Sequence, residues 1–247
     1  MAELVLSLAH PHGALCGVRP PSDEIELSAL IAELLPEEQH LAQEMGFFRA
    51  STFVAGRLAL RAALETVGAD RAPLLQDSRG APTCPAGFVG SIAHKPELAV
   101  ALAAPAQGYG LGVDVEIYDR ERWRILPKIL TEAEIAELSA HANDAQPSGP
   151  WREALARFAI KEAIYKAVDP FVRRYVGFDE AELLGLSLPE PSTLEVPRFV
   201  STAAELRLAR ETLAVTVEAS WADGPFLLAT ARVRTGAPRR RSSVPPL

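Results

Sequence analysis

GVDVE, residues 112–116, is the stretch that decides the fold of this chain, together with a later one, FAIKEAIYK, residues 158–166. Successive side chains of a strand point to opposite faces, so Asp114 and Glu116 share one face. Glu162 comes from a helix and has Lys161 and Lys166 beside it. Magnesium favours a few carboxylates together with substrate phosphates. The two stretches therefore predict a magnesium–diphosphate site.

Each acidic residue also has an ordinary structural interpretation. Asp114 and Glu116 could mark a strand end entering solvent, where carboxylates are common. Glu162 and Lys166 could form a helix-stabilising pair, which contributes about 0.3–0.5 kcal/mol. The apolar stripe of residues 158–167 weighs against this, because charged side chains beside a buried stripe need partners.

The composition is that of an ordinary globular protein, with 247 residues, 48% hydrophobic and 23% charged, and a net charge of −7. The acidic balance argues against nucleic-acid binding. No stretch approaches the roughly 20 apolar residues of a membrane span, and the first residues lack a signal-peptide pattern. Cys16 and Cys84 are too few for a disulfide framework. We therefore expect a cytoplasmic protein that binds no membrane.

Hydrophobic periodicity and breaker residues predict an α+β protein. Thr131, with Glu134 three residues later, predicts a capping box that opens a helix. Gly68 and Pro170 predict the ends of the two longest helices. The expected helices cover 23–45, 47–67, a segment from 131, and 151–168; the expected strands cover 89–92, 98–103, 109–116, 185–188, 205–219 and 226–234. A loop is expected over 72–88 and a hairpin turn over 94–97.

Each half of the chain has a long helix with basic residues, followed by strands. We therefore expect two similar lobes, with the break between them at Pro105–Gly108. The predicted N-terminal lobe covers 1–107, and the C-terminal lobe with the magnesium site covers 108–235. Residues 236–247, which include three arginines and three prolines, are expected to form a disordered tail.

Basic residues supply candidate phosphate ligands. Arg49, Arg57 and Arg61 lie close to one face of the second predicted helix, as either a solvated stripe or a phosphate clamp. His94 lies in the predicted hairpin turn, where its imidazole could donate to a phosphate oxygen. Arg79, in the turn RGAP, could reach a phosphate or stay on the surface.

These motifs together resemble the 4′-phosphopantetheinyl transferases of the larger, monomeric type, the branch that activates surfactin and enterobactin synthetases. Residues 112–116 are similar to the first signature of that family and residues 158–166 to its second. GSIAH, residues 90–94, resembles the strand-and-histidine motif, and the helix with Arg49, Arg57 and Arg61 resembles an arginine-bearing helix. The match runs from about residue 45 to residue 188. One departure is Ala93, where the family usually has serine.

The resemblance implies a fold of two α+β lobes related by a pseudo-twofold axis, with the cofactor cleft between them. It implies that a carrier-protein serine attacks the β-phosphate of coenzyme A, so that phosphopantetheine is transferred and 3′,5′-ADP leaves. By analogy, Mg²⁺ would be held by Asp114, Glu116 and Glu162, with Glu162 and Lys166 as catalytic residues. The cofactor-binding residues would be Arg49, Arg57, Arg79, His94, Lys161 and Lys166.

The implied partner is an apo acyl or peptidyl carrier protein, whose surface around the serine is usually acidic. Arg120, Arg122, Arg124 and Lys128 form a basic stretch that could help to dock it, or could be a solvated helix. An alternative function is a non-catalytic module of the same fold that binds coenzyme A or a nucleotide. A nucleotide hydrolase is disfavoured, because no glycine-rich loop ending in Lys-Ser or Lys-Thr occurs.

Overall fold

The computed structural model describes residues 2–118, 128–141, 149–186, 189, 191–202, 204–206 and 214–236. Its helices are α1 (Glu24–Ile31), α2 (Pro36–Gln43), α3 (Phe47–Thr66), α4 (Glu132–His141) and α5 (Gly149–Val172), with a short 3-10 turn η2 (Phe178–Glu180). Its strands are β1 (Leu4–His10), β2 (Gly13–Val18), β3 (Phe88–Lys95), β4 (Leu98–Pro105), β5 (Tyr109–Glu116), β6 (Ala181–Glu182), β7 (Val200–Thr202), β8 (Glu205–Leu206), β9 (Ala214–Ala222) and β10 (Leu227–Gly236).

Strand β4 shows how the layers are built, because nearly every one of its residues is buried. The alanines at 99, 101 and 103 face α3, where small side chains let the helix come close. Leu98, Val100 and Leu102 face the other way, into a core shared with β5 and β10. A strand that is covered on both faces has a continuous apolar sequence, and β4 has one.

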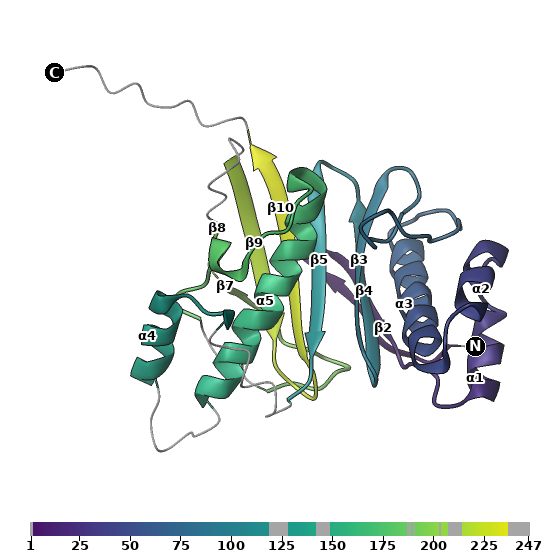
Figure 1. Cartoon of the computed structure of the whole chain (residues 1–247), viewed down its shortest axis with the longest axis horizontal. Helices are drawn as coiled ribbons and strands as arrows, with labels where there is room; N and C mark the ends of the chain where they lie inside the picture. Colours follow the sequence, from purple (N-terminus) through teal and green to yellow (C-terminus); the bar gives the residue numbers. More distant parts are fainter. Residues whose placement is uncertain are drawn as a thin grey trace.

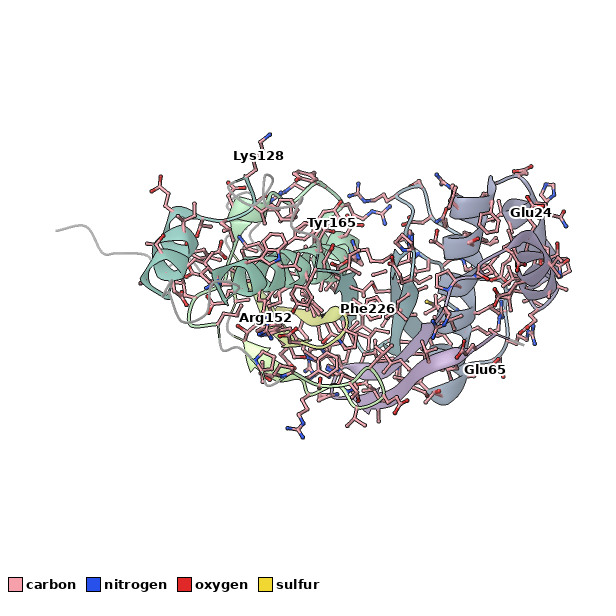
Figure 2. All side chains as sticks on the ribbon, turned by 90° about the horizontal axis from the view of Figure 1, so that it is seen from below. Glu24, Glu65, Lys128, Arg152, Tyr165 and Phe226 are labelled. Carbon is pink, nitrogen blue, oxygen red and sulfur yellow. The ribbon has the colours of Figure 1, made fainter. Side chains whose placement is uncertain are left out.

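Two four-stranded antiparallel sheets form the middle of the molecule. One has the order β1-β2-β4-β3 and the other β5-β10-β9-β7, and β6 and β8 pair with each other in a separate two-stranded sheet. Helix α3 covers the outer face of the first sheet and α5 that of the second, so the layers follow the order helix, sheet, sheet, helix (Figure 1). Figure 2 shows side chains throughout both halves, with Tyr165 and Phe226 in the C-terminal half and Glu24 and Glu65 in the N-terminal half. This is the α+β architecture expected from the sequence.

The two sheets meet along β3 and β5. The Ser91 hydroxyl accepts a hydrogen bond from the Val113 backbone N–H at 3.1 Å, which joins the edge strands of the two sheets. Leu15, Leu102 and Val115 belong to the core between the sheets. The chain passes from one sheet to the other between β4 and β5, at the predicted break. The division into two lobes at residues 107 and 108 stays a prediction.

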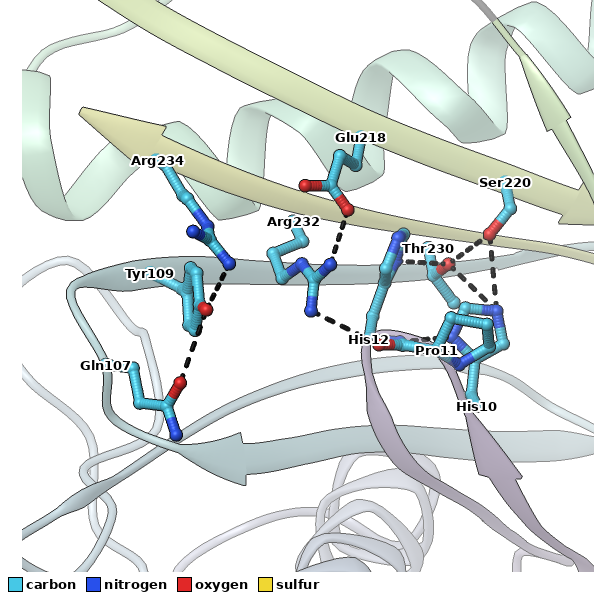
Figure 3. Close-up of polar contacts among 10 residues, drawn as sticks. All are labelled: His10, Pro11, His12, Gln107, Tyr109, Glu218, Ser220, Thr230, Arg232 and Arg234. Carbon is cyan, nitrogen blue, oxygen red and sulfur yellow. Dashed lines mark hydrogen bonds and ion pairs between the residues drawn. The ribbon is translucent and has the colours of Figure 1, made fainter. Parts of the chain in front are cut away.

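A buried polar network joins the tip of the β1–β2 hairpin to β9 and β10 (Figure 3). The His12 backbone N–H donates to His10 Nδ1 at 3.0 Å, so His10 carries its ring proton on Nε2 and donates it to Ser220 Oγ at 3.2 Å. Ser220 Oγ lies 3.0 Å from Thr230 Oγ1, and Thr230 Oγ1 lies 3.0 Å from His12 Nδ1, both at hydrogen-bond distance. All four side chains are buried, and burial favours the neutral form of both imidazoles.

Several predicted elements differ from the structure. The helix expected over 23–45 is two helices, because Pro36 starts α2 and the Glu38 carboxylate accepts from the Leu35 N–H at 3.0 Å. The hairpin β1–β2 was not predicted. No strand is present over 185–186, where Gly185 has φ +64°, and residues 187–188 lie outside the described part.

Helix α5 was expected to stop before Pro170 but continues to Val172. A proline in the last turn removes only one hydrogen bond of the helix, and the Arg173 N–H still donates to the Asp169 carbonyl at 2.9 Å.

The predicted capping box of α4 is confirmed: the Glu134 N–H donates to Thr131 Oγ1 at 3.2 Å, and the Thr131 N–H donates to Glu134 Oε2 at 2.7 Å. The tail expected from residue 236 lies, after Gly236, outside the described residues.

Candidate active site

The site is built where α5 packs against β5 without intervening side chains. A Cβ atom added to Gly110 or Gly112 would lie 1.8 Å from the carbonyl oxygen of Ala167 or Ala163, respectively. Only glycine permits so close an approach between a strand and a helix. Asp114 and Glu116 continue the same face of β5, so their carboxylates point toward α5, as the alternation of the strand predicts. Both are buried, with exposures of 6% and 2%.

A lysine accompanies each of these strand carboxylates. Lys166 of α5 donates from Nζ to Asp114 Oδ1 at 2.7 Å and to the Val113 carbonyl at 2.9 Å. Lys95, the last residue of β3, donates to Glu116 Oε1 at 2.6 Å. Asp114 Oδ2 is buried and has no hydrogen-bond partner. An unpaired carboxylate oxygen in this setting is an acceptor available to a cation.

Glu162 lies half-buried on α5 close to both acids. Its pKa is raised, first by burial and then by the Asp114 carboxylate, while Lys166 opposes the shift. Within the described ranges, no group of three His, Cys, Asp or Glu side chains is arranged to hold a metal ion. The three-carboxylate metal site therefore stays a prediction. The orphan oxygen of Asp114 and the all-oxygen donor set do fit a hard cation such as Mg²⁺.

A cavity of about 550 Å³ opens beside Lys166, between α5, β3, β5 and the loop of residues 77–84. Arg79 reaches across this cavity from the loop to Asp169 of α5. Its Nε lies 2.9 and 3.0 Å from the two carboxylate oxygens, and its Nη2 lies 2.5 Å from Oδ1. Tyr165 and Arg173 also line the cavity. Its size is in the range of a small-molecule site.

A second hollow, of about 340 Å³, lies on the α3 side of the same loop and is lined by Arg49, Arg57 and His94. Arg49 and His94 are exposed. Although His94 is exposed, neighbouring protein atoms displace part of the water around its ring. This desolvation, followed by the positive charges of Lys166 and Lys95, lowers the pKa of His94, and Asp114 opposes the shift. His94 is in β3, paired with Ala99, and not in the hairpin turn, because that turn has only the two residues 96–97.

Two family models match this chain. The 4′-phosphopantetheinyl transferase N-terminal domain matches residues 37–104, and the 4′-phosphopantetheinyl transferase superfamily matches residues 110–218. The 4′-phosphopantetheinyl transferase PptT of Mycobacterium tuberculosis is 32% identical over 172 residues, which are 68% of this chain and 70% of that protein. The chain belongs to the 4′-phosphopantetheinyl transferase family. The succession of both domains identifies it as a transferase of the larger type.

Other family members are similar over shorter regions. The transferase Svp of Streptomyces mobaraensis is 34% identical over 66% of this chain and 63% of its own length. The transferase Npt of Nocardia iowensis is 30% identical over 60% of this chain and 64% of its own length. A crystal structure of Thermotoga maritima holo-[acyl-carrier-protein] synthase covers 51% of this chain and 64% of that chain, with a TM-score of 0.32 and 19% identity.

Not every predicted residue of this transferase joins the site. Lys161 is 2% exposed, and its ammonium donates to Glu134 Oε2 at 2.7 Å, to the Ile129 carbonyl at 2.8 Å and to the Phe178 carbonyl at 3.0 Å. Its amine therefore ties α5 to the segments around α4 and η2, away from Asp114.

Two arginines of α3 also have structural partners. Arg57 is buried and donates from Nε to the Leu74 carbonyl at 2.5 Å, and burial lowers its pKa to about 10. Arg61 pairs with the buried Glu38. Of the basic stretch 120–128, Arg120, Arg122 and Arg124 lie outside the described residues, and Lys128 is exposed.

Sequence reasoning missed Lys95 and Asp169 as residues of the site. Lys95 directly follows His94, so a strand that continued through the predicted turn would have placed it beside β5. Asp169 lies three residues after Lys166 and seven after Glu162, which puts all three on one helix face. The helix was predicted to end at residue 168, so Asp169 was not recognised as part of the same helix face.

Proposed function

We propose that this transferase moves 4′-phosphopantetheine from coenzyme A to a serine of an apo carrier protein in an Mg²⁺-dependent reaction and releases 3′,5′-ADP. The observation that carries the proposal is the pairing of Lys166 with Asp114 beside Glu162, at the edge of a cavity large enough for part of a nucleotide. Phosphoryl-type transfer depends on positioning and on neutralising charge, and this cluster supplies acids and ammonium groups together.

Asp114, Glu116 and Glu162 would hold Mg²⁺, which when bound lowers the charge of the diphosphate. Lys166, His94 and Arg79 would then donate to phosphate oxygens, with Arg49 in the second hollow nearer the 3′-phosphate. Charge-assisted hydrogen bonds of this kind are roughly twice as strong as neutral ones. We propose structural roles for Lys161 and Arg57, because the partners of each are protein groups.

Glu162 is our candidate for the group that accepts the serine proton, directly or through a water molecule. Its half-buried position beside other carboxylates raises its pKa, and a base with a raised pKa accepts a proton more readily at neutral pH. Lys166, one helical turn later, would stabilise the negative charge that develops on the leaving phosphate.

The test is a carrier-labelling assay with coenzyme A, Mg²⁺ and a panel of apo acyl and peptidyl carrier domains. Mass spectrometry should detect the phosphopantetheine mass on the carrier. Asp114→Asn and Glu162→Gln should each lower kcat by about 100-fold or more, because they remove charge from the reacting centre. Glu65→Gln, an exposed carboxylate on α3, is the matched control and should keep the wild-type rate.

Circular dichroism of each variant separates loss of the site from loss of the fold. If a folded Asp114→Asn or Glu162→Gln protein keeps a near-normal rate, the assignment of these carboxylates is wrong. Titration of the wild type with Mg²⁺ in the same assay tests the metal requirement, and full activity in a chelator would exclude it.

A second candidate is a module that binds coenzyme A without transferring it. Lys166 and Arg79 both line the cavity, and the contacts that they offer to phosphate oxygens would serve binding without transfer equally well. Calorimetric binding of coenzyme A without any carrier labelling across the panel would support this alternative.

We further propose a cytoplasmic monomer that acts on carrier domains and not on nucleic acid, consistent with the net charge of −7. Among the helices that the structure describes, none is long and apolar enough to cross a membrane.

A further inference from the structure

The Arg79–Asp169 pair links the N-terminal loop to the last turn of α5. Asp169 is 9% exposed, and both of its oxygens lie within hydrogen-bond distance of the Arg79 guanidinium. Tyr165, one turn earlier on α5, lines the same cavity. An arginine held by both oxygens of a carboxylate on a helix has few conformations available to it.

The turn that carries Arg79 is itself fixed by hydrogen bonds. Asp77 Oδ1 accepts from the backbone N–H groups of Arg79 at 2.8 Å and Ala81 at 3.0 Å. Gly80, with φ +84°, provides the left-handed conformation that the turn requires. Arg173 of the segment after α5 lies 3.7 Å from Asp77 and adds a second, weaker ion pair. Both ends of the Arg79 side chain are therefore anchored.

Asp169 shares its helix face with the catalytic candidates. Positions 162, 166 and 169 differ by four and three residues, so their side chains line one side of α5. Lys166 and Asp169 both line the 550 Å³ cavity. Asp169 therefore lies one helical turn after Lys166, on the side of α5 that lines the cavity.

We propose that Asp169 is a positioning residue, which aims the guanidinium of Arg79 at a phosphate of coenzyme A. This inference rests on the proposed function and adds Asp169 to its machinery. The carboxylate engages Nε and Nη2 of Arg79, so the Nη1 end remains for a ligand. Because Asp169 already holds Arg79 in one orientation, Arg79 loses less conformational entropy when coenzyme A binds than a freely moving arginine would.

If Asp169 acted only through its charge, its removal would change the affinity for coenzyme A in the opposite direction to a loss of positioning. Asp169→Asn removes one negative charge from the cavity wall, and electrostatics alone would then make coenzyme A, a polyanion, bind more tightly. Loss of positioning makes it bind more weakly. The direction of the change in affinity therefore separates the two explanations.

The experiment measures the Kd of coenzyme A and of 3′,5′-ADP by calorimetry, together with kcat and KM. Asp169→Asn and Asp169→Ala should each raise the Kd and KM for coenzyme A about tenfold, with a smaller change in kcat. Arg79→Ala should do the same, and the double variant Arg79→Ala/Asp169→Ala should be no worse than Arg79→Ala alone. Glu218→Ala, which breaks the Arg232–Glu218 ion pair on the other face of its sheet, is the control and should bind coenzyme A normally.

Tighter or unchanged binding by folded Asp169→Asn protein overturns the proposal, and so does an Asp169→Ala effect that persists in full in the Arg79→Ala background. The binding measurement uses no carrier protein, so it remains decisive for Asp169 even if no carrier in the panel is modified. Failure of the wild type to label any carrier would count against the proposed transfer reaction and not against the positioning role.

Discussion

Lys161 and Lys166 lie five residues apart on α5, and the structure gives them different surroundings. Lys166 is half-buried and faces Asp114 at the cavity, whereas Lys161 is enclosed by Glu134 and two backbone carbonyls. Burial lowers the pKa of Lys161, and the Glu134 carboxylate partly restores it. A buried ammonium with all three donors used has no donor left for a phosphate.

Lys161→Met should therefore reduce stability more than it reduces coenzyme A binding. Removing one member of a buried ion pair leaves the other charge uncompensated, which costs about 3–5 kcal/mol. Urea unfolding followed by fluorescence measures this loss, and the KM for coenzyme A should stay close to that of the wild type at low temperature.

Lys166→Met is the matched substitution and should show the reverse, with kcat or KM changed about tenfold or more and a smaller loss of stability. If Lys161→Met raised the KM for coenzyme A as strongly as Lys166→Met, the structural role of Lys161 would be refuted.

At the scale of elements, periodicity predicted the parts in which one face is apolar. The strand at 109–116 and the long helix from residue 47 have the predicted limits within one residue. Residues 4–18 were missed, because Pro11, Gly13 and two histidines interrupt the apolar pattern of that hairpin, and only its packing against β4 and β10 specifies it. The acidic residues of the site could be predicted from their spacing. Lys166 could be predicted with them, but Lys95 could not, since it comes from a different sheet.

The contact between β5 and α5 carries the second prediction. Gly112→Ala places a methyl group 1.8 Å from the Ala163 carbonyl, so the helix must move away from the strand. Overpacking costs about 1–3 kcal/mol, and the shift separates Asp114 from Lys166 and Glu162. We expect a lower Tm and a kcat reduced by about 10-fold or more, measured by calorimetry and by the carrier-labelling assay.

Gly46→Ala is the matched control, because Gly46 has φ −67° and no atom lies within 4 Å of an added Cβ. Because Gly46 is the N-cap of α3, where alanine is less favourable than glycine, Gly46→Ala should lower stability by about 1 kcal/mol at most and leave kcat unchanged. A Gly112→Ala protein with wild-type kcat would show that the site does not depend on this close approach.

At the scale of the whole molecule, three of the connections that the described residues make between the N-terminal and C-terminal halves differ in their chemistry. An apolar core lies between the sheets, the Arg79–Asp169 pair crosses the cavity, and the histidine network closes the far side. The first two connections contain no histidine. The third contains two imidazoles that the fold keeps neutral, so it makes the junction sensitive to acid.

The pKa of His10 is lowered to about 3 by burial, then by His12 and Arg232; that of His12 is lowered to about 4 by burial and Arg232, with Glu218 opposing. In the unfolded chain both would titrate near pH 6.5. The neutral network therefore stabilises the fold fully above about pH 6.5, and the stabilisation is lost as the pH falls toward 4. Nδ1 of His10 accepts a hydrogen bond from the His12 backbone N–H, so protonation of that nitrogen breaks the contact.

We expect the free energy of unfolding of the wild type to fall by about 2 kcal/mol for each histidine between pH 7 and pH 5. His10→Asn and His12→Asn keep an acceptor oxygen near the position of Nδ1 but cannot be protonated, so each should flatten the pH dependence while lowering stability at pH 7. His40→Asn, on exposed α2, is the control and should keep the wild-type slope. Urea titrations from pH 4.5 to 8 measure the effect, and equal slopes for wild type and both network variants would show that the junction does not sense pH.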